Sequence, residues 1–120
     1  MGMQASKSRY SGIIQKYVKV INVRVNGRSM TPYFEDGQRI TVEKFSKQGL
    51  KKGDIIVYRH PIDKNRNVIH RIERIEGDKK YRTKGDAWYE WDNYTVGEED
   101  IIGVYREGKD SAADEKGESL

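Results

Sequence analysis

The chain has 120 residues, of which 35% are apolar and 35% are charged, and its formal net charge is +4. That length fits one domain with a modest core, and no apolar stretch is long enough to cross a bilayer. Because cysteine is absent, a disulfide framework, a thiolate metal site and a cysteine nucleophile are excluded. The polar residues 1–9 lack the apolar segment of a secretion signal, so we expect a cytoplasmic protein.

The predicted elements are mostly short strands. Residues 1–8 are polar and unpatterned and predict a disordered N-terminus. Apolar residues at helical spacing predict a short helix over 9–17. Runs of β-branched residues between Gly and Asp turns predict strands at residues 18–25, 38–45, 55–58, 68–75, 80–83 and 101–106. This pattern predicts an all-β sandwich or a coiled, partly open barrel over residues 9–106, followed by a disordered charged tail over 107–120.

The excess of basic residues is a weak indication of a partner. A polyanion such as nucleic acid would suit a net charge of +4. However, no block of five or more basic residues occurs, and a solvated surface rich in lysine explains the charge more simply. Nucleic acid is therefore not expected as the partner.

Ser29 and His70 are the residues whose types and settings suggest chemistry. Ser29 follows Gly27 at the predicted end of a strand and precedes Pro32, whereas His70 lies within a strand on the same face as apolar residues. A serine hydroxyl becomes a nucleophile when an imidazole takes its proton and a carboxylate orients the ring. Each residue alone also has an ordinary explanation, as a turn serine or a hydrogen-bonded core histidine. The other histidine, His60, is expected to be an exposed loop residue.

A family resemblance is carried by short boxes in a fixed order. The Gly-x-Ser-Met-x-Pro box of type I signal peptidases and the related repressor-type serine peptidases resembles Gly27-Arg28-Ser29-Met30-Thr31-Pro32. The Val-x-His-Arg box of the archaeal and endoplasmic-reticulum signal peptidases is similar to Val68-Ile69-His70-Arg71. Further boxes of the family resemble residues 34–38, 50–58, 83–86 and 101–104, so the resemblance covers roughly residues 20–106.

The resemblance implies a serine endopeptidase built on a coiled, partly open β-barrel. It implies that Ser29 is the nucleophile and that His70 is the general base, at the position where bacterial relatives carry a lysine. It implies that Asp92 is the third catalytic residue, with Asp86 as the other aspartate that could fill this role. No metal and no cofactor are implied.

The remaining residues of the boxes are expected to support the site. Asp86 would then be a supporting carboxylate, Met30 a core or pocket-lining residue, and Arg28 an exposed residue that could touch substrate. The resemblance implies that the Ser29 backbone N–H holds the oxyanion. Some relatives add a serine hydroxyl two residues earlier, and Gly27 stands at that position here.

The expected substrate is a peptide or protein that adds as a strand to the edge near residues 23–28. The resemblance implies a small residue beside the cut. Signal peptidases of this subtype carry a membrane anchor before the serine box, and no apolar span precedes Ser29 here. We therefore expect either a membrane-anchored partner or a soluble relative that trims a specific peptide.

Two alternatives belong to other functional classes. A repressor-type self-cleaving domain would need a lysine base and an upstream DNA-binding domain, and residues 1–28 contain no such domain. A non-catalytic β-domain could bind peptide or nucleic acid through its basic residues and an aromatic loop formed by Trp88, Tyr89, Trp91 and Tyr94. Tryptophans beside a turn are more often loop anchors, so the peptidase is the preferred interpretation.

Overall fold

The structure is a computed structural model that describes residues 19–107 and 118–119. The predicted disordered N-terminus and the predicted helix over 9–17 lie outside the described residues. Within them, almost all regular structure is β-strand, with one short 3₁₀ helix at Glu98–Asp100. The prediction of a mainly β protein is therefore confirmed.

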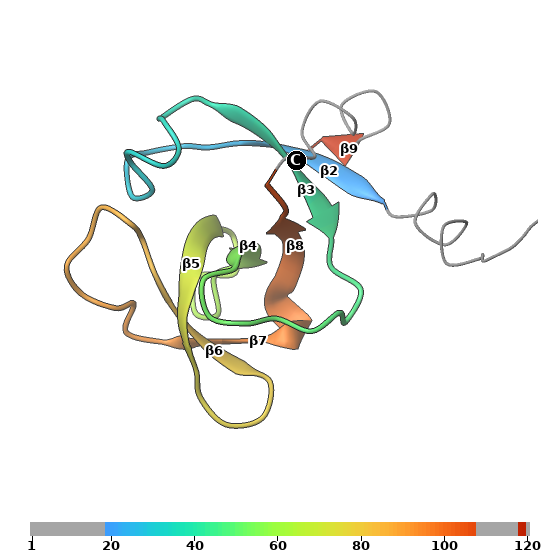
Figure 1. Ribbon diagram of the computed structural model, residues 1–120, viewed down its shortest axis with the longest axis vertical. Coiled ribbons are helices and arrows are strands. Elements are labelled where there is room, and N and C mark those ends of the chain that lie inside the picture. Colours follow the sequence, from blue (N-terminus) through green and yellow to red (C-terminus); the bar gives the residue numbers. More distant parts are fainter. Residues whose placement is uncertain (1–18, 108–117, 120) are drawn as a thin grey trace, which may run out of the picture.

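Eight strands form one sheet that curls into a half-barrel (Figure 1). Their order across the sheet is β7-β6-β5-β4-β8-β3-β2-β9, and neighbours run antiparallel except that β9 runs parallel to β2. The strand bounds are β2 Val20–Arg24, β3 Arg39–Lys44, β4 Ile55–Arg59, β5 Asn67–Ile75, β6 Lys80–Lys84, β7 Thr95–Gly97, β8 Ile101–Tyr105 and β9 Glu118–Ser119. Of the two architectures that the strand pattern allowed, the partly open barrel is the observed one.

Strand β5 is the longest strand, and the sheet bends along it. Its first half pairs with β4, from Asn67 to Arg71, and its second half pairs with β6, from Arg71 to Ile75. The register of the β5–β6 ladder shifts between Ile72 and Arg74. An irregularity of this kind bends a strand and increases its twist. It therefore turns β6 and β7 out of the plane of β4 and β8 and leaves the first half of β5 uncovered on that edge.

The core has two parts, and β4 contributes to both. Ile55 and Val57 face one cluster, and Ile56 and Tyr58 face the other, so β4 is buried on both sides. The first cluster also contains Ile21, Val23, Val25, Ile40, Val42, Met30 and Phe34. The second is completed by Ile72, Tyr81, Val96, Ile101 and Val104. A strand buried on both faces reads as a continuous apolar run, which explains the Ile-Ile-Val-Tyr sequence of β4.

The loop after β2 is anchored by two of its own side chains. Met30 is 0% exposed and Phe34 is 2% exposed, and both belong to the first core cluster. Burying one such side chain contributes about 1.5–3 kcal/mol. The loop is therefore held against the sheet at the residue that follows Ser29.

Two residues near the C-terminus belong to the sheet. Glu118–Ser119 forms β9, which pairs in parallel with Ile21 and Asn22 of β2. Two polar residues carry no strand pattern, so sequence alone gave no indication of this pairing. Residues 108–117 and 120 lie outside the described residues.

Candidate active site

Ser29 lies in the loop that connects β2 to β3. This loop closes on itself through backbone hydrogen bonds from Val25 N–H to Gln38 O, 2.8 Å, and from Gly37 N–H to Val25 O, 2.7 Å. Gly27 has a φ of +89°, a left-handed conformation that favours glycine, and its N–H donates to Asp36 Oδ1 at 2.8 Å. The turn at Gly27 thus leads the chain from the end of β2 to a half-buried Ser29 at the mouth of a cleft.

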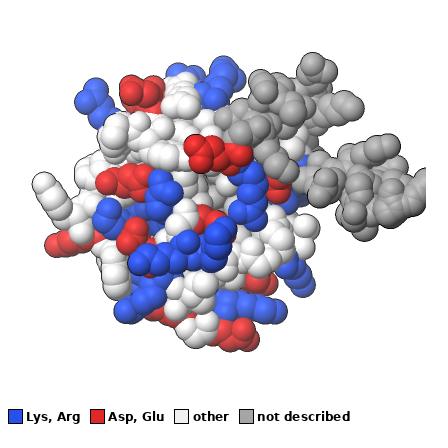
Figure 2. All heavy atoms as spheres, in the orientation of Figure 1, with Lys and Arg blue, Asp and Glu red and all other residues white. Residues whose placement is uncertain are grey.

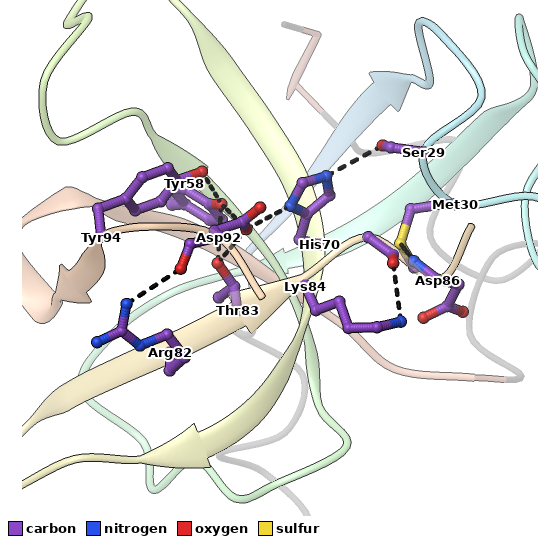
Figure 3. A network of polar contacts seen from close by, with 11 residues as sticks. Ser29, Met30, Tyr58, His70, Arg82, Thr83, Lys84, Asp86, Asp92 and Tyr94 are labelled. Carbon is purple, nitrogen blue, oxygen red and sulfur yellow. Dashed lines mark hydrogen bonds and ion pairs between the residues drawn. The ribbon is translucent and has the colours of Figure 1, made fainter. Parts of the chain in front are cut away.

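His70 lies on β5 and faces Ser29. Its Nε2 atom is 3.1 Å from Ser29 Oγ, and its Nδ1 atom is 2.7 Å from Asp92 Oδ2 (Figure 3). The His70 side chain is 9% exposed, so it is largely shielded from water. The structure therefore brings together the hydroxyl, imidazole and carboxylate that the sequence predicted as a set.

The Asp92 carboxylate is surrounded by hydrogen-bond donors. Thr83 Oγ1 donates to Asp92 Oδ2 at 2.6 Å, and the Tyr58 hydroxyl lies 3.3 Å from the same oxygen. Burial alone raises the pKa of Asp92, but hydrogen bonds from His70 and Thr83 outweigh it and hold the pKa below its usual value. Asp92 is therefore an anion that can orient His70 and stabilise its protonated form.

Two tyrosines stand behind this aspartate. The Tyr58 hydroxyl is 2.7 Å from the Tyr94 hydroxyl and 3.1 Å from Thr83 Oγ1. Burial raises the pKa of both tyrosines, so both hydroxyls keep their protons. Sequence reasoning missed Tyr58 and Thr83, because each looks like an ordinary strand residue. Tyr58 lies on β4 and Thr83 on β6, and the pairing of both strands with β5 places their hydroxyl groups next to Asp92.

A close backbone approach fixes Ser29 from the other side. The Ala87 N–H donates to the Ser29 carbonyl at 2.8 Å. A Cβ atom added to Gly85 would lie 2.7 Å from that carbonyl oxygen and 3.0 Å from His70 Nε2. Glycine is therefore the residue that lets the turn after β6 pack against the serine and the histidine.

Asp86 has a different set of partners from Asp92. Its carboxylate accepts two hydrogen bonds from Arg71, from Nε at 2.9 Å and from Nη2 at 2.7 Å. Its backbone N–H points to Met30 Sδ at 3.5 Å. Asp86 thus connects the turn after β6 to β5 through Arg71 and to the serine loop through Met30. Of the two aspartates, Asp92 is the one bonded to His70.

The site opens into a cleft of about 560 Å³. Ser29, His70 and Asp92 line it together with Arg28 and the half-exposed Trp88, whereas Met30 is fully buried beneath the serine loop. Among the described residues, no group of three or more His, Asp or Glu side chains is placed to hold a metal ion.

His60 also borders the cleft, which corrects the expectation of an exposed loop residue. It is half-buried, and its ring lies 4.6 Å from the Tyr94 ring. Its Nδ1 atom accepts hydrogen bonds from the N–H groups of Ile62 and Asp63 at 3.1 and 3.0 Å. His60 is thus occupied in shaping its own loop, and His70 is the histidine that meets Ser29.

The contacts from Ser29 through His70 to Asp92 have the geometry of the triad found in serine hydrolases. The chain also matches, over residues 8–89, the family model described as signal peptidase, peptidase S26. Since this match spans more than half of the chain, the protein belongs to the signal peptidase family S26. The family resemblance inferred from the sequence boxes is thereby confirmed.

Relatives of known name share this part of the chain. Mitochondrial inner membrane protease subunit 1 of Homo sapiens is 29% identical over 86 residues, which cover 59% of this chain and 52% of the relative. Signal peptidase IB of Staphylococcus aureus is 32% identical over 79 residues, which cover 64% of this chain and 39% of the relative. The chain therefore spans about half, or less, of the length of these relatives.

Proposed function

We propose that the protein is a serine endopeptidase of the signal peptidase type, with Ser29 as nucleophile, His70 as general base and Asp92 as the carboxylate that orients His70. One observation carries the proposal: His70 Nε2 lies 3.1 Å from Ser29 Oγ while His70 Nδ1 lies 2.7 Å from Asp92 Oδ2. Both are hydrogen-bond distances, so His70 can take the Ser29 proton while Asp92 holds the ring in place.

The proposed reaction proceeds in two halves. His70 takes the proton of the Ser29 hydroxyl as the oxygen attacks the scissile carbonyl, and the resulting imidazolium gives that proton to the leaving amine. An acyl group then remains on Ser29 until water, deprotonated by His70, hydrolyses the ester. In the described part of the chain the Ser29 N–H has no acceptor, so it can donate to the oxyanion.

The residues around the cleft favour a histidine base over a lysine base. None of the described residues that line the cleft is a lysine. The nearby Lys84 directs its Nζ atom to the Gly85 carbonyl, at 3.1 Å. His70 is therefore the group in reach of the Ser29 hydroxyl that can accept its proton near neutral pH.

An extended peptide is the substrate that suits the cleft. Strand β9 pairs with β2 only at Ile21 and Asn22, and β6 pairs with β5 only from Arg71 onward. In the described residues the edges at 23–28 and 67–70 therefore extend past these ladders, and residues from both edges line the cleft. Backbone groups on such edges can pair with a substrate strand and present its carbonyl to Ser29.

The relatives suggest where such a peptidase would act. One is named as a subunit of a protease of the mitochondrial inner membrane. In the described part of this chain, no helix is both long and apolar enough to span a bilayer. If the substrate is cleaved at a membrane, we propose that a membrane-anchored partner brings this domain to it.

The aromatic loop gives the non-catalytic alternative little support. The Arg74 guanidinium lies 4.8 Å from the centre of the Trp91 ring, and the Tyr94 hydroxyl is bonded to Tyr58, so two of the four loop aromatics have partners within the protein. On the face shown in Figure 2, positive and negative side chains are interspersed. Nucleic-acid sites usually gather positive charge on one face.

The test is cleavage of a library of extended peptides that contain small residues, followed by mass spectrometry. We expect the protein to cut a subset of the peptides and Ser29→Ala to cut none, with an unchanged circular dichroism spectrum. Ser46→Ala is the control, because Ser46 is exposed and, within the described residues, its hydroxyl bonds only to Gln48. Equal cleavage by Ser29→Ala and the unchanged protein would rule out Ser29 as the nucleophile.

A further inference from the structure

We infer that the cleft selects substrates with acidic side chains close to the scissile bond. The inference rests on the proposed peptidase function and adds the chemical class of its substrate. It is carried by three arginines that line the same cleft as Ser29, namely Arg24, Arg28 and Arg66.

These three arginines are exposed and have no carboxylate partner among the described residues. Most other arginines in that part of the chain do have one. Arg59 pairs with Asp100, and Arg71 with Asp86. Arg74 and Arg82 both pair with Glu76, and Arg106 lies near Asp54 and Glu43. Unpaired guanidinium groups are thus concentrated at the cleft.

The cleft contains little negative charge of its own. Among the described residues that line it, Asp92 is the only acidic one, and its carboxylate is already engaged by His70 and Thr83. The three arginines in this concave site therefore have no ion-pair partner among the described residues, and positive charge gathered in a cleft favours the approach of anionic groups. A substrate that carries carboxylates would neutralise them.

The three arginines line the cleft on two walls. Arg24 ends β2 and Arg28 immediately precedes Ser29, so both lie on the wall that carries the nucleophile. Arg66 lies across the cleft, in the loop just before β5. A peptide strand held between these walls would place its side chains near either set. Guanidinium groups bind carboxylates with paired hydrogen bonds, so Glu or Asp side chains suit these positions.

The first experiment compares three peptides that have alanine before the scissile bond and differ only in the flanking residues, which are Glu, Gln or Lys. We expect kcat/KM to decrease in that order. Each exposed pair of opposite charges changes binding by about two- to fivefold, so we expect roughly a tenfold or greater preference for Glu over Gln. The preference should shrink as salt concentration increases.

The second experiment assigns the preference to the cleft. We expect Arg24→Gln, Arg28→Gln and Arg66→Gln each to reduce the Glu-to-Gln preference, measured as the ratio of the two kcat/KM values, by about two- to fivefold. The matched control is Arg39→Gln. Arg39 is exposed, has no ion pair among the described residues and lies opposite Arg24 on β3, but it does not line the cleft. The Arg39→Gln variant removes one positive charge, as the cleft variants do, and should leave the Glu-to-Gln preference unchanged.

Binding to the Ser29→Ala protein separates this inference from the proposed function. Fluorescence anisotropy with the same labelled peptides should show tighter binding of the Glu peptide, and this advantage should be lost when all three arginines are replaced. That result would support the preference for acidic peptides even if no peptide were cleaved. A failure to cleave any peptide would contradict the proposed peptidase activity but not the binding preference. Equal affinity for the Glu and Gln peptides, or an equal loss in Arg39→Gln, would overturn the inference. Preferential binding of single-stranded DNA through the same arginines would also overturn it.

Discussion

The hydroxyl of Thr83 lies 2.6 Å from Asp92 Oδ2, the same carboxylate oxygen that faces His70. Thr83 is 0% exposed and comes from β6, whereas Asp92 lies in the loop after that strand. The backbone repeats this contact, since Asp92 N–H donates to the Thr83 carbonyl at 2.9 Å. Thr83 therefore holds the carboxylate next to the imidazole, and in the proposed mechanism it would act as a positioning residue.

Replacing Thr83 by valine should reduce kcat about tenfold with little change in KM, because a hydrogen bond to a charged group is worth about 1.5–3 kcal/mol. Valine keeps the size of threonine, so the fold should be retained. Loss of this donor should raise the pKa of Asp92, so in the variant the loss of activity on the acid side should begin at a higher pH. The matched control is Thr41→Val, on β3 and outside the cleft, where the hydroxyl bonds to Asn22. Equal kinetic effects of the two variants would contradict a positioning role for Thr83.

Asp92 and Asp86 should respond differently to substitution by asparagine. Asp92→Asn should reduce kcat by about two orders of magnitude or more, because the amide cannot stabilise the imidazolium. Asp86→Asn should mainly reduce the free energy of unfolding, by about 1 kcal/mol, since the Arg71–Asp86 pair is partly exposed at 25% and 21%. Steady-state kinetics and urea denaturation of both variants would separate the roles. A larger loss of kcat in Asp86→Asn would exchange the two assignments.

The pH dependence of activity should report an imidazole base. The base must be unprotonated to accept the serine proton, so kcat/KM should increase with pH between weakly acidic and neutral pH, where a histidine can serve as a base. Because the pKa of Asp92 is held below its usual value, Asp92 stays ionised over this range and adds no second step. An activity that increases only at alkaline pH would indicate a lysine base.

Gly85→Ala should impair catalysis through crowding rather than through chemistry. The added Cβ atom would lie 2.7 Å from the Ser29 carbonyl oxygen and 3.0 Å from His70 Nε2, so the turn after β6 must move away. Such overpacking typically costs about 1–3 kcal/mol, and we expect kcat/KM to fall about tenfold or more. Gly49→Ala is the control, because its Cβ atom would meet nothing within 4 Å. Unchanged activity of Gly85→Ala would show that the close approach is not needed.

Much of the fold follows from alternation in the sequence. The Ile40 and Val42 pair predicts one buried face of β3, and both side chains are buried. The apolar run from Ile55 to Tyr58 predicts a compact strand, and β4 is buried on both faces. Strand β7 has only three residues, and β9 has two polar ones, so neither carries a readable period. Both strands lie at the edges of the sheet, where β7 pairs with β6 and β9 pairs with β2.

The site was predicted from family boxes more than from spacing. Ser29 and His70 are 41 residues apart, and no local pattern indicates that their side chains meet. The contacts of Tyr58 and Thr83 with Asp92 depend on how three strands align, which the sequence does not encode locally. Composition likewise gives a net charge of +4, but it does not show which arginines form ion pairs and which line the cleft without one.

The most direct measurement is to trap the acyl-enzyme. The protein is mixed with a peptide that it cleaves, quenched in acid during the first turnovers, digested and mapped by mass spectrometry. We predict that the acyl half of the substrate is esterified to Ser29, that His70→Ala accumulates far less of this adduct, and that Ser29→Ala forms none. An adduct on another residue, or continued turnover by Ser29→Ala, would contradict a nucleophilic Ser29 activated by His70.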